Sequence, residues 1–186
     1  MNPKKLLILD LDETLIHGAT QKLDYEPACI APWCFLYIRP FVEDFMAFCK
    51  DHFKVAIWTT ASPEHAEMAL GQICESDYPF EFIWTSNRCT QARDKIGMDD
   101  YGSGYHWVKD LKKVKRLGFN LDQVLMIDDT PSMLERQYGN LVQIKRFKGD
   151  SEDQELPKLM RYLIELSGEK NIRNIDKLGW EIRYQV

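Results

Sequence analysis

The chain has 186 residues, of which 45% are hydrophobic and 28% are charged, and its formal net charge is -5. These values exclude a disordered or fibrous protein and favour a single folded domain over residues 1–186. The negative charge argues against broad affinity for nucleic acids or membranes, and we expect neither as a partner.

An apolar run near the start of the chain ends in acidic residues. Residues 6–11 are typical of a buried parallel strand, because a strand covered on both faces is apolar without alternation. Asp10 and Asp12 stand at its carboxyl end, the edge where open α/β sheets bind ligands. Carboxylates there suit a hard cation, and an aspartate can attack an electrophile. Alone, however, this pattern more often marks a strand that enters a solvated acidic turn.

The first half of the chain then alternates between strands and helices. In order, we predict an irregular loop at 18–33, a short strand at 35–38, a helix opened by Pro40, a buried strand at 55–59, a helix from 63 to about 74, and a strand at 80–84. Ser62 and Pro63 favour a helix start, since serine caps the first turn and proline suits its first position.

The second half continues the alternation. We predict a loop or small hairpin at 86–106, a helix at 109–116, a buried strand at 124–127, a helix after Thr130-Pro131, a strand at 141–147 and an amphipathic helix at 156–164. Trp180, Ile182 and Tyr184 alternate, as in either an edge strand or a packed surface segment. Strands that alternate with helices predict an α/β fold with a parallel sheet flanked by helices.

Polar residues follow several of the predicted strands at the point where each strand ends. Asp10, the pair Thr59-Thr60 and the pair Asp128-Asp129 all stand at such positions. Because the carboxyl ends of parallel strands meet at one edge, we expect these side chains to converge.

Several motifs in this order resemble one known family. They are 8-ILDLDETLIH-17, 58-WTTAS-62, 107-WVKDL-111 and 126-MIDDTP-131, with Arg39-Pro40-Phe41 resembling the pair that precedes the first helix of that family. The set is similar to the haloacid dehalogenase superfamily, and more narrowly to DxDxT phosphatases of the RNA polymerase C-terminal-domain phosphatase, or NLI-interacting-factor-like, group. The likeness extends from about residue 4 to 166. It implies a Rossmann-like parallel sheet with a small inserted hairpin, and magnesium-dependent hydrolysis of phosphate monoesters through an aspartyl-phosphate.

The resemblance also implies roles for the acidic residues. Asp10 would be the nucleophile and a metal ligand, and Asp12 would be the general acid and base, with its backbone carbonyl on the metal. Asp129 would be a further ligand of Mg²⁺, at a position where many relatives have asparagine, so that this chain carries an extra negative charge. Asp128 would orient Lys109. Haloacid dehalogenation itself is disfavoured, because it needs no metal and its enzymes typically lack the second acid, Asp12.

Other matched residues would contact the substrate. Thr60 and Ala61 would bind the phosphoryl group, Lys109 would supply positive charge to it, and Arg88, in a segment that resembles a family stretch, would touch the substrate. The alignment selects Thr60 over Thr59 by one position only. Alone, a threonine near a helix start or a lysine in a lysine-rich helix is usually structural or solvated.

Two substrate classes and one inactive alternative stay open at this point. The main expectation is phosphoserine or phosphothreonine in a protein or peptide, because a short insertion at 86–106 leaves an open site. The aromatic residues Tyr101, Tyr105 and Trp107 of this region would flank the phosphate or pack the hairpin. The alternatives are a small phosphorylated metabolite or nucleic-acid end, and an inactive binding module, although the chain retains every motif residue.

Cysteine usage and the chain start bear on location. The five cysteines include no CxxC pair and are odd in number, which favours free thiols in a reducing compartment. No apolar run is long enough to cross a bilayer, and the start leads directly into the first strand without room for a signal peptide. We expect a cytoplasmic monomer, or a nuclear one in a eukaryote, and we expect the four histidines to be structural or exposed.

Overall fold

A computed structural model describes residues 3–93 and 104–184 of the chain. Within these residues, five strands form a parallel sheet in the order β10-β9-β1-β5-β6. The strands are β1 (Leu6–Leu9), β5 (Lys54–Trp58), β6 (Phe80–Trp84), β9 (Val124–Asp128) and β10 (Leu141–Gln143). All four residues of β1 are buried, because β1 pairs with β9 and β5 and both of its faces are covered. The predicted α/β fold class is confirmed.

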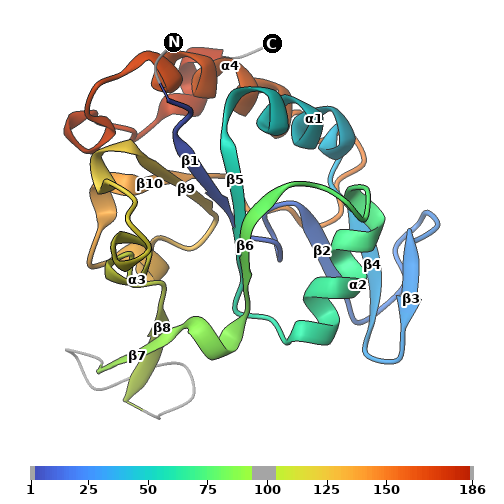
Figure 1. Cartoon of the computed structure of the whole chain (residues 1–186). Coiled ribbons are helices and arrows are strands. Elements are labelled where there is room, and N and C mark those ends of the chain that lie inside the picture. The colour runs from blue at the N-terminus through green and yellow to red at the C-terminus, as the bar shows by residue number, and fades with distance from the viewer. Residues whose placement is uncertain (1–2, 94–103, 185–186) are drawn as a thin grey trace.

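Helices cover both faces of this sheet (Figure 1). They are α1 (Val42–His52), α2 (Pro63–Ile73), α3 (Lys112–Arg116) and α4 (Glu155–Gly168). Leu7 and Leu9 of β1 belong to the core that contains the buried residues of α1, α2 and α4. Leu6 and Ile8 point to the opposite side and pack in the core that contains Val114 of α3. Alternate residues of one strand therefore anchor different layers.

Two smaller antiparallel units flank the main sheet. One contains β2 (Ile16–Ala19), β3 (Cys29–Ala31) and β4 (Cys34–Ile38), in the order β2-β4-β3. The other is a hairpin of β7 (Thr90–Arg93) and β8 (Tyr105–Val108), which lies at the bottom of Figure 1. The two strands lie at either end of the small insertion expected at 86–106, with β8 continuing to Val108, whereas residues 94–103, including Tyr101, lie outside the described residues.

Short 3₁₀ turns connect the larger elements. They are η1 (Ser86–Arg88), η2 (Leu121–Gln123), η3 (Pro131–Leu134), η4 (Tyr138–Asn140), η5 (Ile172–Asn174) and η6 (Trp180–Tyr184). In η6, the buried Trp180 stacks on Tyr162 of α4 with ring centroids 5.3 Å apart. The tail therefore packs on the fold and does not form an edge strand.

Several local predictions were wrong. Residues 18–33 are not wholly irregular, since β2 and β3 pair with β4, and such long-range pairing leaves little trace in local sequence. A helix was predicted after Thr130-Pro131, but this segment forms only the short turns η3 and η4. Leu134 is the buried residue of η3, and no apolar stripe continues from it that could bury one face of a longer helix. The helix predicted at 109–116 begins only at Lys112, where the Asp110 carboxylate accepts the backbone N–H at 3.0 Å.

Candidate active site

The central strands of the sheet end at one level and place their polar residues together. Leu9 of β1 pairs with Ile57 of β5 on one side and with Ile127 of β9 on the other. The backbone N–H of Asp10 then donates to the Ile127 carbonyl at 3.0 Å, which extends the ladder by one step. The expected convergence of the strand ends is therefore present, and it fixes the backbone of Asp10 next to that of Asp128.

Lys109 lies between the carboxylates of Asp10 and Asp128. Its Nζ donates to Asp10 Oδ1 at 2.6 Å and to Asp128 Oδ2 at 2.8 Å. All three side chains are buried, and isolated buried charges are costly, so each depends on the others. Lys109 directly follows β8, so the inserted hairpin positions its ammonium group at the edge of the sheet. The expected pair of Lys109 and Asp128 is present, and Lys109 also contacts Asp10.

Burial changes the acidity of these groups. Removal from water raises the pKa of Asp10 to about 8, with Lys109 opposing this shift and the Asp128 charge adding to it. Burial likewise raises the pKa of Asp128. For Lys109, burial favours the neutral amine, but the two carboxylates prevail and raise its pKa. The site therefore holds an ammonium group at neutral pH, and further positive charge would favour the ionised form of Asp10.

Asp10, Asp128 and Asp129 are arranged in a way that fits a divalent cation. Among the described residues, each offers a carboxylate oxygen, and these oxygens all lie within 4.8 Å of one another. Such an all-oxygen set suits Mg²⁺, which usually keeps several waters. The sequence interpretation assigned the ligands Asp10, Asp12 and Asp129, with Asp12 acting through its backbone. The side chain of Asp128, which was expected only to orient Lys109, joins this group.

Asp12 is held through both oxygens of its carboxylate. The hydroxyl of Thr59 donates to Oδ2 at 3.2 Å, and Nε2 of His65 lies 2.8 Å from Oδ1. The contact with Asp12 raises the pKa of His65. Sequence reasoning missed both partners. The signal that could have identified His65 is its place in the first turn of α2, directly after the Thr60-Ala61 segment.

The loop that carries the two aspartates is fixed by its neighbours. Glu13 has a φ of 60°, which is uncommon outside glycine. The hydroxyl of Thr14 donates to Asp10 Oδ2 at 3.3 Å, in keeping with its expected role in supporting the loop. Nη1 of the fully buried Arg39 donates to the Thr14 carbonyl at 2.9 Å, and its Nε and Nη2 donate to Asp153 at 2.8 and 3.0 Å. Arg39 thus connects this loop to the segment before α4.

Thr60 and Ala61 line a cavity beside Asp12. The cavity has a volume of about 660 Å³, and its lining comprises Asp12, Trp33, Thr60, Ala61, Ser62, Glu64 and His65. Thr60 is exposed, whereas Thr59 is buried with its hydroxyl occupied by Asp12. This difference favours Thr60 as the threonine available to a substrate.

Arg88 does not line the cavity beside Asp12. Its guanidinium stacks over the Trp84 ring, 4.5 Å from the centroid, and it lines a groove of about 820 Å³ between α2 and β6. This groove and the cavity beside Asp12 have no lining residue in common, so the expected contact between Arg88 and the substrate stays a prediction.

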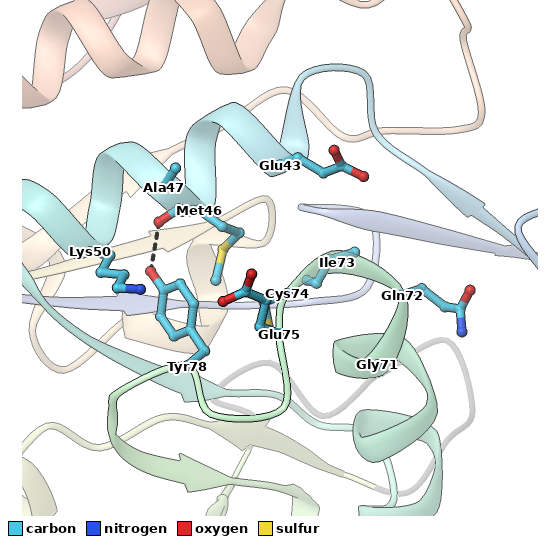
Figure 2. Close-up of a pocket in the computed structure, with 10 residues that line it drawn as sticks. All are labelled: Glu43, Met46, Ala47, Lys50, Gly71, Gln72, Ile73, Cys74, Glu75 and Tyr78. Carbon is cyan, nitrogen blue, oxygen red and sulfur yellow. Dashed lines mark hydrogen bonds between the residues drawn. The ribbon is translucent and has the colours of Figure 1, made fainter.

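A further cavity lies at the opposite end of α2 (Figure 2). It has a volume of about 440 Å³ and is lined by the C-terminal part of α2 together with residues of α1. The Tyr78 hydroxyl donates to the Met46 carbonyl at 2.7 Å across its wall, the dashed line in Figure 2. None of the predicted site residues lines this cavity, and the strand ends lie near the other end of α2, so it is not the candidate active site.

Comparisons with known proteins agree with this arrangement. CTD small phosphatase-like protein 2 of Dictyostelium discoideum is 30% identical over 180 residues, which cover 92% of this chain and 29% of that protein. The structure of the fission yeast RNA polymerase II CTD phosphatase Fcp1 matches with a TM-score of 0.57 at 15% identity, over 88% of this chain and 50% of that one. A HAD-superfamily hydrolase from Geobacter sulfurreducens matches with a TM-score of 0.55 at 14% identity, over 89% and 97%. At these identities, the two structures support the fold alone.

The chain spans between 29% and 41% of the length of three curated relatives that it matches. Among the described residues, helices long and apolar enough to cross a membrane are absent. Residues 5–173 match the model of the family described as NLI interacting factor-like phosphatase. The converging strand ends, the fold of HAD-superfamily hydrolases and this match over most of the chain lead to one conclusion: the chain belongs to the NLI interacting factor-like phosphatase family.

Proposed function

We propose that this chain hydrolyses phosphate monoesters, with Asp10 as the nucleophile. The observation that carries the proposal is the buried contact of Asp10 with Lys109 at a strand end, with Asp12 two residues further along the same loop. An Asp10 oxygen attacks the phosphorus atom and forms an acyl phosphate, while the bond to the leaving oxygen breaks. Asp12 gives its proton to that oxygen. Lys109 stabilises negative charge on the phosphoryl group.

The second half of the reaction restores the enzyme. Asp12, now a carboxylate, accepts a proton from a water molecule that attacks the phosphorus atom. The bond between phosphorus and Asp10 breaks, and inorganic phosphate leaves. Asp12 thus acts first as an acid and then as a base, a change that its partly exposed position next to the cavity permits.

We assign the metal site to the carboxylates of Asp10, Asp128 and Asp129, with the backbone carbonyl of Asp12 as a further ligand. Mg²⁺ held there would neutralise phosphoryl oxygens and favour the ionised form of Asp10. The spacing of the carboxylate oxygens supports this assignment, because all three carboxylates can reach a single ion.

For the substrate, we propose phosphoserine or phosphothreonine in an extended peptide. The cavity beside Asp12 supports this class, because it is bounded by the exposed Trp33 and offers room for residues that flank a phosphate. The described part of the insertion is a short hairpin rather than a large cap that would enclose a metabolite. Relatives named as CTD phosphatases point in the same direction. Thr60 and Ala61 would bind the phosphoryl group, and Arg88 would contact the peptide outside it.

The test compares a panel of phosphopeptides with a panel of phosphorylated metabolites and nucleic-acid ends, under Mg²⁺ and after treatment with a chelator. We expect phosphopeptide substrates to give the highest kcat/KM. We also expect rapid acid quenching to trap a phosphoryl group on the enzyme, in the proteolytic fragment that contains Asp10. A clear preference for metabolites or nucleic-acid ends would overturn the substrate assignment. Turnover by Asp10→Asn equal to that of the wild type would overturn the mechanism. A cytoplasmic or nuclear location and a monomeric state stay predictions.

A further inference from the structure

The proposed general acid is hydrogen-bonded to two different elements of the fold. Asp12 lies on the loop after β1, whereas Thr59 directly follows β5 and His65 belongs to the first turn of α2. Each partner contacts a different carboxylate oxygen, so neither contact substitutes for the other. A carboxylate fixed at both oxygens loses its freedom to rotate about the bond to its Cβ. The direction in which Asp12 presents its proton therefore depends on these two partners.

Trp33 specifies which nitrogen of His65 carries the proton. The Trp33 indole N–H donates to His65 Nδ1 at 3.3 Å, so Nδ1 acts as an acceptor and Nε2 carries the hydrogen of the neutral ring. That hydrogen points at Asp12 Oδ1, which lies 2.8 Å from Nε2. Two successive hydrogen bonds thus connect Trp33 to His65 and His65 to Asp12, and all three residues line the cavity beside Asp12.

His65 is itself held in place by the start of α2. Pro63 occupies an initial position of the helix, and the Ser62 hydroxyl oxygen accepts the backbone N–H of His65 at 3.2 Å. These features restrict the backbone of the first turn. The His65 side chain is 13% exposed, so its ring is largely enclosed. An imidazole on a capped helix start can fix a loop carboxylate more firmly than solvent can.

We propose that His65 is a positioning residue, which orients Asp12 toward the oxygen of the leaving group. This inference rests on the proposed function, in which Asp12 protonates that oxygen. His65 does not touch the substrate phosphate in this assignment and takes no part in the formation of bonds. Its effect is confined to the step that needs a proton from Asp12, namely the release of a poor leaving group.

The experiment compares kcat/KM for a phosphoserine peptide and for nitrophenyl phosphate in several variants. kcat/KM reports the steps up to release of the leaving group, so later hydrolysis of the acyl phosphate does not contribute. Nitrophenolate leaves without protonation, whereas the serine oxygen requires it. His65→Ala is expected to lower kcat/KM for the peptide by about 10- to 100-fold and for nitrophenyl phosphate by less than about threefold. The loss for the peptide is a part of the full effect of general acid catalysis, because Asp12 itself is still present. His65→Gln retains an N–H near the position of Nε2 and is expected to restore most of the loss.

The controls separate positioning from structure. His52→Ala removes an exposed histidine at the end of α1, and Gln72→Ala alters an exposed residue near the end of α2, away from the strand ends; both are expected to leave the two kcat/KM values unchanged. Asp12→Asn supplies the reference pattern for loss of the acid. Suppose that Asp12→Asn lowers kcat/KM for the peptide selectively. If His65→Ala then lowers kcat/KM equally for both substrates, or does not lower it for the peptide, the positioning role is overturned and the proposed function stays intact. Absence of selectivity in Asp12→Asn would instead overturn the acid role of Asp12, and the inference with it.

Discussion

The buried ion pair of Arg39 and Asp153 offers a quantitative test of how the catalytic loop is stabilised. Asp153→Asn removes one charge but keeps an oxygen in place, so the acceptor for the Glu155 N–H, 3.0 Å away, is retained. The retained oxygen can also still accept from Arg39 Nε, but Nη2 loses its acceptor Oδ2, so the buried guanidinium is left without a charged partner. Removal of one member of a buried pair typically costs about 3–5 kcal/mol, and the retained oxygen places this variant near 3. For a chain of this length, we expect the melting temperature to fall by about 6–12 °C.

The pH dependence of this loss has a definite sign. Although burial favours the neutral carboxyl, the hydrogen bonds and charge of Arg39 hold the pKa of Asp153 below its usual range. A carboxyl with a depressed pKa in the folded state stabilises the protein above its unfolded value of about 3.9, and this contribution is lost as the pH falls through the folded-state pKa. The difference between wild type and variant is therefore expected to be constant from about pH 7 to 5 and to shrink below about pH 4.

The assay is urea unfolding followed by circular dichroism at each pH. Glu26→Gln serves as the matched control, because it breaks an ion pair with Lys22 in which the Glu26 side chain is 83% exposed. Its cost is expected to stay below about 0.5 kcal/mol at every pH. A loss for Asp153→Asn below about 1 kcal/mol at pH 7, or a loss that persists unchanged at the lowest pH, would refute the reasoning.

Further predictions concern the site itself. Asp10→Asn, or treatment of the wild type with a chelator, is expected to abolish hydrolysis of an aryl phosphate. Circular dichroism is expected to show an intact fold, and Mg²⁺ is expected to restore the activity of the chelated enzyme. Hydrolysis at the wild-type rate in either case would contradict the assignment. Lys109→Ala and Asp128→Asn are expected to act as one unit, so that the double variant costs little more activity than Lys109→Ala alone. Fully additive effects on log kcat would show that the two side chains work independently. Trp33→Ala and Arg88→Ala are expected to lower kcat/KM for phosphopeptides more than for the aryl phosphate, and parallel losses would assign these side chains to general structure.

The sequence predicted the strand ends well, because those ends follow a local rule. A continuous apolar run that ends in a polar residue predicts both a buried parallel strand and the edge at which its side chains meet. Asp10 and Asp128 could therefore be brought together before their contacts were known, whereas Lys109 was assigned to the site only through the resemblance of its motif to the family. The helix predicted at 156–164 is present as α4, which extends from Glu155 to Gly168. Ile164 is exposed, whereas Tyr162 and Leu166 are buried, so the face that packs on the core is rotated from the one that the aliphatic residues suggest.

Other parts of the site follow no local rule. His65 and Thr59 contact Asp12 from separate elements, and the distances in sequence are 53 and 47 residues. The position of each residue in the sequence indicates at most that it lies near the strand ends, and its contact with Asp12 depends on how α2 and β5 pack beside the first loop. The pairing of β3 with β4, which places Trp33 next to His65, is likewise a tertiary result. Sequence patterns thus indicated the chemistry, whereas the side chains that orient it required the structure.

The balance of charge at the strand ends explains why a divalent cation suits this site better than a further basic side chain. Lys109 contacts the carboxylates of Asp10 and Asp128, and Arg146 Nε lies 2.7 Å from the neighbouring carboxylate of Asp129. With these three carboxyls ionised and both basic groups charged, one negative charge is left over, which would repel a phosphate ester. A divalent cation changes the sign of this balance, while Arg146 offsets the charge that aspartate adds at position 129. Because the Arg146 side chain is 53% exposed, its contribution is screened by solvent and salt, whereas charge held among buried carboxylates is screened far less. In the proposed mechanism, the buried carboxylates and the cation that they would hold therefore contribute more to binding of the phosphate than the exposed Arg146 does.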